Sequence, residues 1–186
     1  TNPYTPQQVA SAYLHPDGPA YSGTGQKIGI IVAYRHPYLQ RDFDAFCIKF
    51  NLPMKTLIIH NNATLISSTW AVESCLDTQW SHVFAPDAQL HVYQARTSSY
   101  TDIRTSILQA VNDGMNIVSM SLGSSEFPSV FPLLEGIFSA NPSIIFLAAS
   151  GDTSVVSYPS TSPNVISVGG TRLYLEMDGL DGSRRP

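Results

Sequence analysis

Short apolar runs alternate with amphipathic segments along the whole chain. Six runs dense in Ile, Val and Leu have the pattern of strands covered on both faces. Four segments between the runs carry apolar residues at helical spacing. The expected strands cover 27–34, 56–60, 89–95, 116–122, 143–150 and 164–173, and the expected helices cover 39–50, 68–84, 102–113 and 131–140. Because strands and helices alternate, the pattern predicts an α/β fold: a parallel sheet with helices on both faces.

The length of 186 residues is typical of one domain. Near the end of the chain, two Asp-Gly turn signals at 178–179 and 181–182 precede two arginines and Pro186. We therefore expect residues 1–177 to form the domain and 178–186 to form a tail or linker.

Composition narrows the class of protein. The net charge of −4 and the scarcity of lysine argue against a nucleic-acid partner. The chain has no apolar run near the ~20 residues of a membrane span, so we expect no membrane partner. Cys47 and Cys75 both fall at apolar helix positions, and we expect buried thiols that are not bonded to each other. The five histidines lack metal-ligand spacing, so no metal site is predicted.

The expected helix 68–84 carries two acids one turn apart, Glu73 and Asp77. We expect the core face of this helix to be the stripe of Val72, Leu76 and Val83, with Ala71 and Cys75 beside it. Two interpretations of the acids stay open. They can lie on a solvated face, or they can form a coupled pair in a cleft that shares a proton and titrates as a unit. Trp80 and Phe84 continue the line of the acids and favour partial burial.

Two strand ends are candidate parts of a site, because ligands bind beyond the carboxyl ends of parallel strands. Asp152 follows the run that ends at Ser150, although an Asp there can also simply bond a turn. Ser121, Leu122 and Gly123 follow another run, and their small size would let an extended peptide pair with the backbone. An ordinary exit from strand to loop is the alternative.

Several stretches, taken in order, resemble the sedolisin family of serine-carboxyl peptidases. The resemblance covers nearly all of the chain, and its strength lies in the order of the motifs. The matching stretches are TPQQV at 5–9, GTGQKIGII at 23–31, WAVESCLD at 70–77, APDAQL at 85–90, VSMSLG at 118–123, ASGD at 149–152, SPNV at 162–165 and VGGT at 168–171.

The resemblance implies a subtilisin-like fold and endopeptidase or tripeptidyl-peptidase activity at acidic pH. Carried over by position, it implies that Glu73 is the general base, that Asp77 orients Glu73 and relays its proton, and that Asp152 is the oxyanion-hole acid. These roles are consistent with catalysis at acidic pH, because a carboxyl group that keeps its proton can donate a hydrogen bond to a developing oxyanion.

Two departures from the family pattern change the expectation. The family places its nucleophile in a G-T-S-x-x-x-P motif beyond the VGGT region, and its calcium site near the C-terminus; these 186 residues contain no such motif. We therefore expect a fold without its C-terminal portion, no nucleophile, and no cofactor or metal in this chain. Some members also have Trp at the position of Leu122 and Glu at the position of Val32, so an outer hydrogen-bond relay is not expected here.

The resulting hypothesis is part of an acid-acting peptidase, inactive alone, that acts on a peptide or protein substrate. Its expected partner is a C-terminal segment that carries the nucleophilic serine, or a second copy of the chain. A secreted protein, or one from another acidic extracytoplasmic compartment, fits this hypothesis. The alternative is a non-catalytic half-domain that binds peptides or a partner. A subtilisin-type site is set aside, because the helix offers Glu73 where a histidine would be needed.

Overall fold

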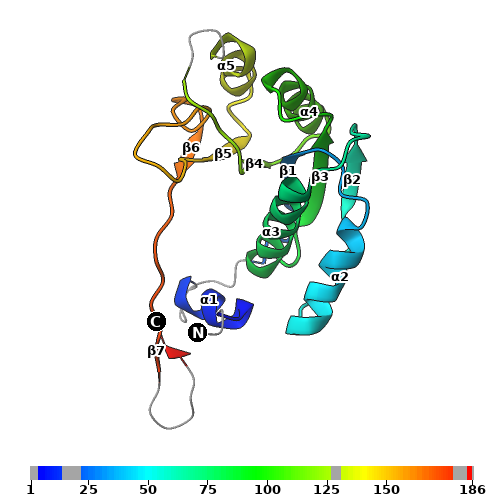
Figure 1. Cartoon of the computed structure of the whole chain (residues 1–186), viewed down its shortest axis with the longest axis vertical. Helices are drawn as coiled ribbons and strands as arrows, with labels where there is room; N and C mark the ends of the chain where they lie inside the picture. The colour runs from blue at the N-terminus through cyan, green and yellow to red at the C-terminus, as the bar shows by residue number, and fades with distance from the viewer. Residues whose placement is uncertain (1–3, 14–21, 127–130, 178–183, 186) are drawn as a thin grey trace.

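The computed structural model describes residues 4–13, 22–126, 131–177 and 184–185. Its centre is a six-stranded sheet in the order β2-β3-β1-β4-β5-β6, with every neighbouring pair parallel (Figure 1). The strands are β1 Lys27–Ala33, β2 Ile58–Asn61, β3 Gln89–Ala95, β4 Ile117–Met120, β5 Ile145–Ala149 and β6 Ile166–Val168. The predicted α/β class and parallel sheet are confirmed.

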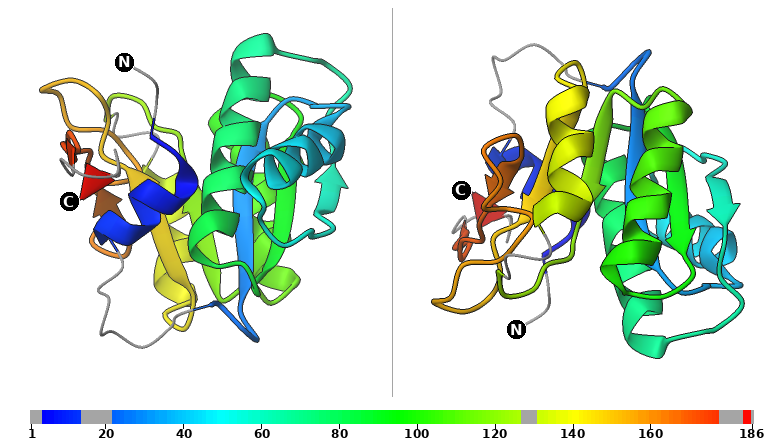
Figure 2. Two further views of the ribbon diagram at one scale, coloured as in Figure 1. Left: turned by 90° about the horizontal axis from the view of Figure 1, so that it is seen from below. Right: turned by 90° about the horizontal axis from the view of Figure 1, so that it is seen from above.

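Helices cover both faces of the sheet, as the two opposite views in Figure 2 show. One face packs against α4 and α5, and the other packs against α2 and α3, with α1 beside α3. The helices are α1 Pro6–Tyr13, α2 Leu39–Phe50, α3 Ser68–Phe84, α4 Tyr100–Asn112 and α5 Phe131–Ala140. Successive residues of β1 enter the two cores in turn, since Ile30 packs on the α2 side and Ile31 on the α4 side.

The N-terminal helix α1 was not predicted. It is short, but its start has a capping box: the backbone N–H of Gln8 donates to Thr5 Oγ1, and the Thr5 N–H donates to Gln8 Oε1 at 2.9 Å. Pro6 occupies the first helical position, where a missing N–H costs nothing. These local signals, rather than an apolar stripe, define the helix.

A small antiparallel pair lies in the segment expected to be a tail. Strand β7, Glu176–Met177, pairs with β8, Arg184–Arg185, and β8 contacts α1. Two residues of the segment expected to be a tail or linker therefore form a short strand. The rest of the 178–186 segment lies outside the described residues, and the domain boundary at 177 stays a prediction.

The predicted core face of α3 is wrong. Val72 is 71% exposed and Leu76 is 48% exposed, whereas Ser74, Thr78 and His82 are almost fully buried. The Ser74 hydroxyl donates to the Trp70 carbonyl at 2.7 Å, and the Thr78 hydroxyl donates to the Ser74 carbonyl at 2.8 Å. Because these hydroxyls are satisfied within the helix, small polar residues can face the neighbouring strand and helix at close range.

Both cysteines are free, as predicted. Cys47 lies on the buried face of α2, whereas Cys75 is only partly buried, so the predicted burial of Cys75 is wrong. Within the described part of the chain, every helix is too short or too polar to cross a bilayer.

Candidate active site

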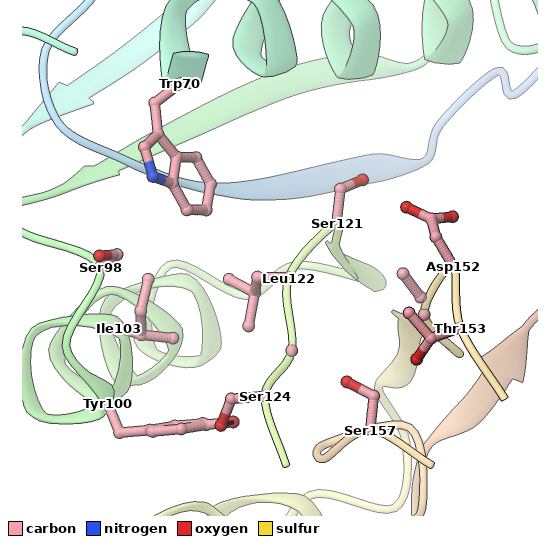
Figure 3. A pocket seen from close by; sticks show the side chains of 13 residues that line it. Trp70, Ser98, Tyr100, Ile103, Ser121, Leu122, Ser124, Asp152, Thr153 and Ser157 are labelled. Carbon is pink, nitrogen blue, oxygen red and sulfur yellow. Dashed lines mark hydrogen bonds between the residues drawn. The ribbon is translucent and has the colours of Figure 1, made fainter. Parts of the chain in front are cut away.

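A cleft of about 670 Å³ opens beyond the carboxyl ends of the strands (Figure 3). Its floor and walls come from the exits of β3, β4 and β5, the N-terminal turn of α4, and Trp70 of α3. The lining includes Ser98, Tyr100, Ser121, Leu122, Gly123, Ser124, Asp152, Thr153 and Ser157. The two strand exits that the sequence analysis singled out therefore meet in one cleft, as parallel pairing of β4 and β5 requires.

Asp77 is linked to this cleft through Ser121. The Ser121 hydroxyl donates to Asp77 Oδ1 at 2.7 Å, which joins the exit of β4 to helix α3. The other oxygen, Oδ2, is buried and has no hydrogen-bond partner among the described residues. An unpaired buried carboxylate oxygen is costly, and this favours a protonated Asp77.

The surroundings of Asp77 change its acidity strongly. Burial raises the pKa of the Asp77 carboxyl, donation from Ser121 opposes this, and the neighbouring Glu73 raises it further, so that the pKa is about 7. Glu73 lies half-buried one turn earlier on α3. The interpretation of a solvated acidic face therefore fails for Asp77. The expectation that the two carboxyl groups lie within hydrogen-bond reach, directly or through one water, stays a prediction.

Asp152 is exposed at the rim of the cleft, where Figure 3 shows it opposite Ser121. Asp152 also lines a second, adjoining cavity of about 380 Å³. Ser121 lines both cavities, and Gly169 and Gly170 line the second one. Ser121 and Asp152 therefore line both cavities, and Asp77 is connected to them through its hydrogen bond with Ser121. Neither Glu73 nor Asp77 is among the residues that line the two cavities.

The segment from Ser121 to Gly123 is open to pairing. Ser124 exchanges two backbone hydrogen bonds with Tyr158, at 3.1 and 2.9 Å, but Leu122 and Gly123 form none with another described residue. A Cβ at Gly123 would collide with the Ser157 side chain. A larger residue at this position would therefore displace the Ser157 hydroxyl, whereas the free backbone groups of Leu122 and Gly123 can pair with an extended chain.

The sequence analysis missed the aromatic part of the cleft. Trp70 lines the cleft, and the Tyr100 hydroxyl donates to the Tyr158 carbonyl at 2.8 Å. Trp80, which continues the line of the acids along α3, is partly buried and packs against Phe46 of α2, with ring centroids 6.5 Å apart. Trp70 lies three residues before Glu73, so helical spacing offered a signal for it.

Comparison with known proteins agrees with this architecture. The model of the subtilase family, Peptidase S8, matches residues 59–184. Kumamolisin from Bacillus sp. (strain MN-32) is 30% identical over 193 residues, a match that covers 91% of this chain and 34% of kumamolisin. The chain therefore spans about a third of the length of this curated relative.

Solved structures share the fold. Pseudomonas sedolisin, a serine-carboxyl proteinase complexed with two molecules of pseudo-iodotyrostatin, matches with a TM-score of 0.76 and 24% identity, over 93% of this chain and 55% of that one. A lanthipeptide protease matches with a TM-score of 0.56 and 19% identity, over 80% of this chain and 50% of that one. The family model covers well over half of the chain, the sedolisin resemblance is confirmed, and the chain belongs to the subtilase family.

Proposed function

We propose that this chain is part of an acid-acting serine-carboxyl peptidase that hydrolyses peptide bonds in peptide or protein substrates. The observation that carries the proposal is Ser121, which lines the cleft together with Asp152 (Figure 3) and donates a hydrogen bond to Asp77 of α3. Family membership and the fold match to a serine-carboxyl proteinase support the reaction class.

In the proposed reaction, Glu73 takes the proton of a serine hydroxyl as that oxygen attacks the scissile carbonyl, and it returns the proton to the leaving amine. Asp77 orients Glu73 and exchanges a proton with it. The raised pKa of Asp77, about 7, supports this role, because Asp77 keeps a proton available throughout the acidic range.

Asp152 has the proposed role of a protonated acid that donates a hydrogen bond to the oxyanion. Its place at the rim, facing Ser121, supports this role. The substrate is proposed to lie along Ser121 to Gly123 as an added strand, with side chains directed toward Trp70 and Leu122. Val32 is fully buried in the core, so no carboxylate extends the network from β1.

The nucleophilic serine is proposed to come from a segment with the G-T-S-x-x-x-P motif, which the printed 186 residues do not contain. That segment would be the partner of this chain, and the complete enzyme is proposed to work in a secreted or other acidic extracytoplasmic setting. Without a nucleophile, a residual acceleration of roughly 10³–10⁴ over water is the most that comparable knockouts retain.

The test is to assay the 186-residue chain on an unfolded protein at about pH 4, near the ordinary pKa of carboxyl groups. The chain is assayed alone and after addition of a separately produced segment with the serine motif. We expect no measurable cleavage by the chain alone, cleavage after mixing, and loss of that cleavage in Glu73→Gln. Glu126→Gln is the matched control, because Glu126 is exposed and outside the cleft lining.

Two outcomes contradict the proposal. Robust cleavage by the chain alone that survives Glu73→Gln would mean that the chemistry lies elsewhere. Peptide binding by the mixture without any hydrolysis would favour the non-catalytic half-domain.

A further inference from the structure

A second cluster of reactive side chains lies away from the cleft, on the face covered by α2 and α3. It consists of His36 in the turn after β1, Asp42 in the first turn of α2, and Cys75 of α3. His36 Nε2 is 3.2 Å from Asp42 Oδ2 and 3.3 Å from Cys75 Sγ. The three donor atoms all lie within 4.8 Å of one another.

These distances match a tetrahedral metal site. With bonds of about 2.0–2.3 Å from Zn²⁺ to nitrogen, oxygen and sulfur, neighbouring nitrogen and oxygen donors lie roughly 3.3 Å apart, and nitrogen and sulfur donors roughly 3.5 Å apart. The observed nitrogen–oxygen and nitrogen–sulfur distances are close to these values. Small adjustments of the side chains would therefore suffice to bind an ion.

Two of the three side chains converge on a single ring nitrogen of the third. Both Asp42 and Cys75 approach the same ring nitrogen of His36, and one N–H cannot point at both. The His36 side chain is only 8% exposed, so its ring is held in place between α2 and α3. A metal ion would satisfy all three donors at once. We propose that His36, Asp42 and Cys75 form a three-ligand site for a divalent transition metal ion of the Zn²⁺ class.

The donor set decides which metals fit. Thiolate and imidazole ligands favour Zn²⁺ and its neighbours over Mg²⁺ and Ca²⁺, which prefer all-oxygen sites. A groove of about 420 Å³ borders the three ligands and leaves the fourth position open to water or a small ligand. Arg41 donates to the other Asp42 oxygen at 3.0 Å, which orients the carboxylate toward the site.

Metal binding requires a particular tautomer of the His36 ring. Coordination through Nε2 places the ring proton on Nδ1, where the Tyr38 backbone N–H now donates at 3.4 Å. That contact lies at the long end of the hydrogen-bond range and in an exposed turn, so its release costs little. The Cys75 thiol loses its proton to solvent as the ion binds.

The ion would link three elements that are distant in sequence: the β1–α2 turn, α2 and α3. Because α3 also carries Glu73 and Asp77, the site would fix the helix on which the proposed catalytic carboxyls stand. The site uses the outer side of α3, next to exposed Val72 and Leu76, and is separate from the cleft.

The test uses the 186-residue chain, freed of metal by a chelator and titrated with Co²⁺ as a spectroscopic probe. We expect one Co²⁺ per chain, the visible bands of tetrahedral cobalt, a thiolate-to-cobalt charge-transfer band, and displacement of both by Zn²⁺. Cys75→Ser should abolish the charge-transfer band and weaken binding by at least about 100-fold, since loss of an outer partner alone costs 10- to 100-fold. Cys47→Ala, which removes the other thiol, should leave the band in place.

A second pair of variants guards against misfolding of Cys75→Ser. Asp42→Asn keeps the thiol and should weaken Co²⁺ binding by at least about 10-fold. Asp44→Asn, two residues along the same helix, should bind as the unmodified chain does. The proposal is overturned if the unmodified chain gives no thiolate band, if Cys75→Ser retains it, or if Asp42→Asn binds as tightly as Asp44→Asn.

Discussion

At the scale of single residues, Asp77 shows how position on a helix and tertiary contact act together. The spacing of Glu73 and Asp77 predicts that both acids share one helix face. The contact from Ser121 depends on where β4 ends relative to α3, and local spacing does not contain that information. The candidate acids could therefore be predicted from the sequence, but the hydroxyl that connects Asp77 to the cleft could not.

Asp77→Asn should make the free energy of unfolding less dependent on pH. The pKa of Asp77 is raised to about 7 in the fold, so its contribution to stability is complete below its ordinary pKa and is lost as the pH rises through 7. Relative to the unmodified chain, the variant should therefore gain stability between pH 4 and pH 8, on the order of 4 kcal/mol. Urea unfolding at several pH values measures the difference.

Asp102→Asn is a control, because its effect on the free energy of unfolding should depend on pH in the opposite direction. Its carboxylate accepts from Thr97, and this lowers the pKa of Asp102. The stability that Asp102 contributes is present above its ordinary pKa and is lost in acid, so its variant should lose stability at neutral pH but not in strong acid. If the stability of Asp77→Asn follows that of the unmodified chain at every pH, Asp77 is not the perturbed group.

At the scale of elements, α3 is a helix whose buried face cannot be predicted from the spacing of its apolar residues. Its apolar stripe faces solvent and its buried face is polar, because Ser74 and Thr78 satisfy their hydroxyls within the helix. The strands were easier to predict, since their continuous apolar runs match burial on both faces, as in β3, where every residue after Gln89 is buried. Strand ends were predicted too long where loop residues such as Leu122 are also apolar.

The inverted burial of α3 gives a direct test. Thr78→Asp should lower the free energy of unfolding by roughly 3 kcal/mol, because it places an unpaired charge at a fully buried position. Val72→Asp, on the exposed stripe, should change it by no more than about 0.5 kcal/mol. Chemical denaturation of the two variants compares the faces, and a larger loss for Val72→Asp would restore the original assignment of the core.

At the scale of the whole molecule, sheet order explains why the site forms where it does. The chain builds β1, β2 and β3 on one side and then crosses to β4, β5 and β6 on the other. Exits of β3, β4 and β5 therefore converge at one end of the sheet, and the cleft lies there. The sequence predicted parallel strands and this shared end, but strand order depends on long-range pairing, which local patterns do not encode.

The same order leaves apolar strands at the edges of the sheet, and we expect the isolated chain to associate with itself through one of them. Strand β6 is an edge strand of the sheet, and its Ile166 and Val168 are 55% and 48% exposed. Ile145 of the neighbouring strand β5 is also 48% exposed. Edge strands with unpaired backbone groups and apolar side chains are templates for a further strand. Sedimentation at increasing protein concentration should show a dimer or larger species.

Charge on that edge should prevent the association. Ile166→Lys combined with Val168→Lys should give a monomer, because two lysines at an open edge disfavour the pairing of a second chain. The matched control is Ile58→Lys with Ile59→Lys on β2, the opposite edge, where exposure is 41% and 39%. The β2 pair should leave association through β6 intact. If the unmodified chain stays monomeric at every concentration, β6 is not the contact. The same conclusion follows if the double lysine variant on β2 prevents association as well as the double variant on β6 does.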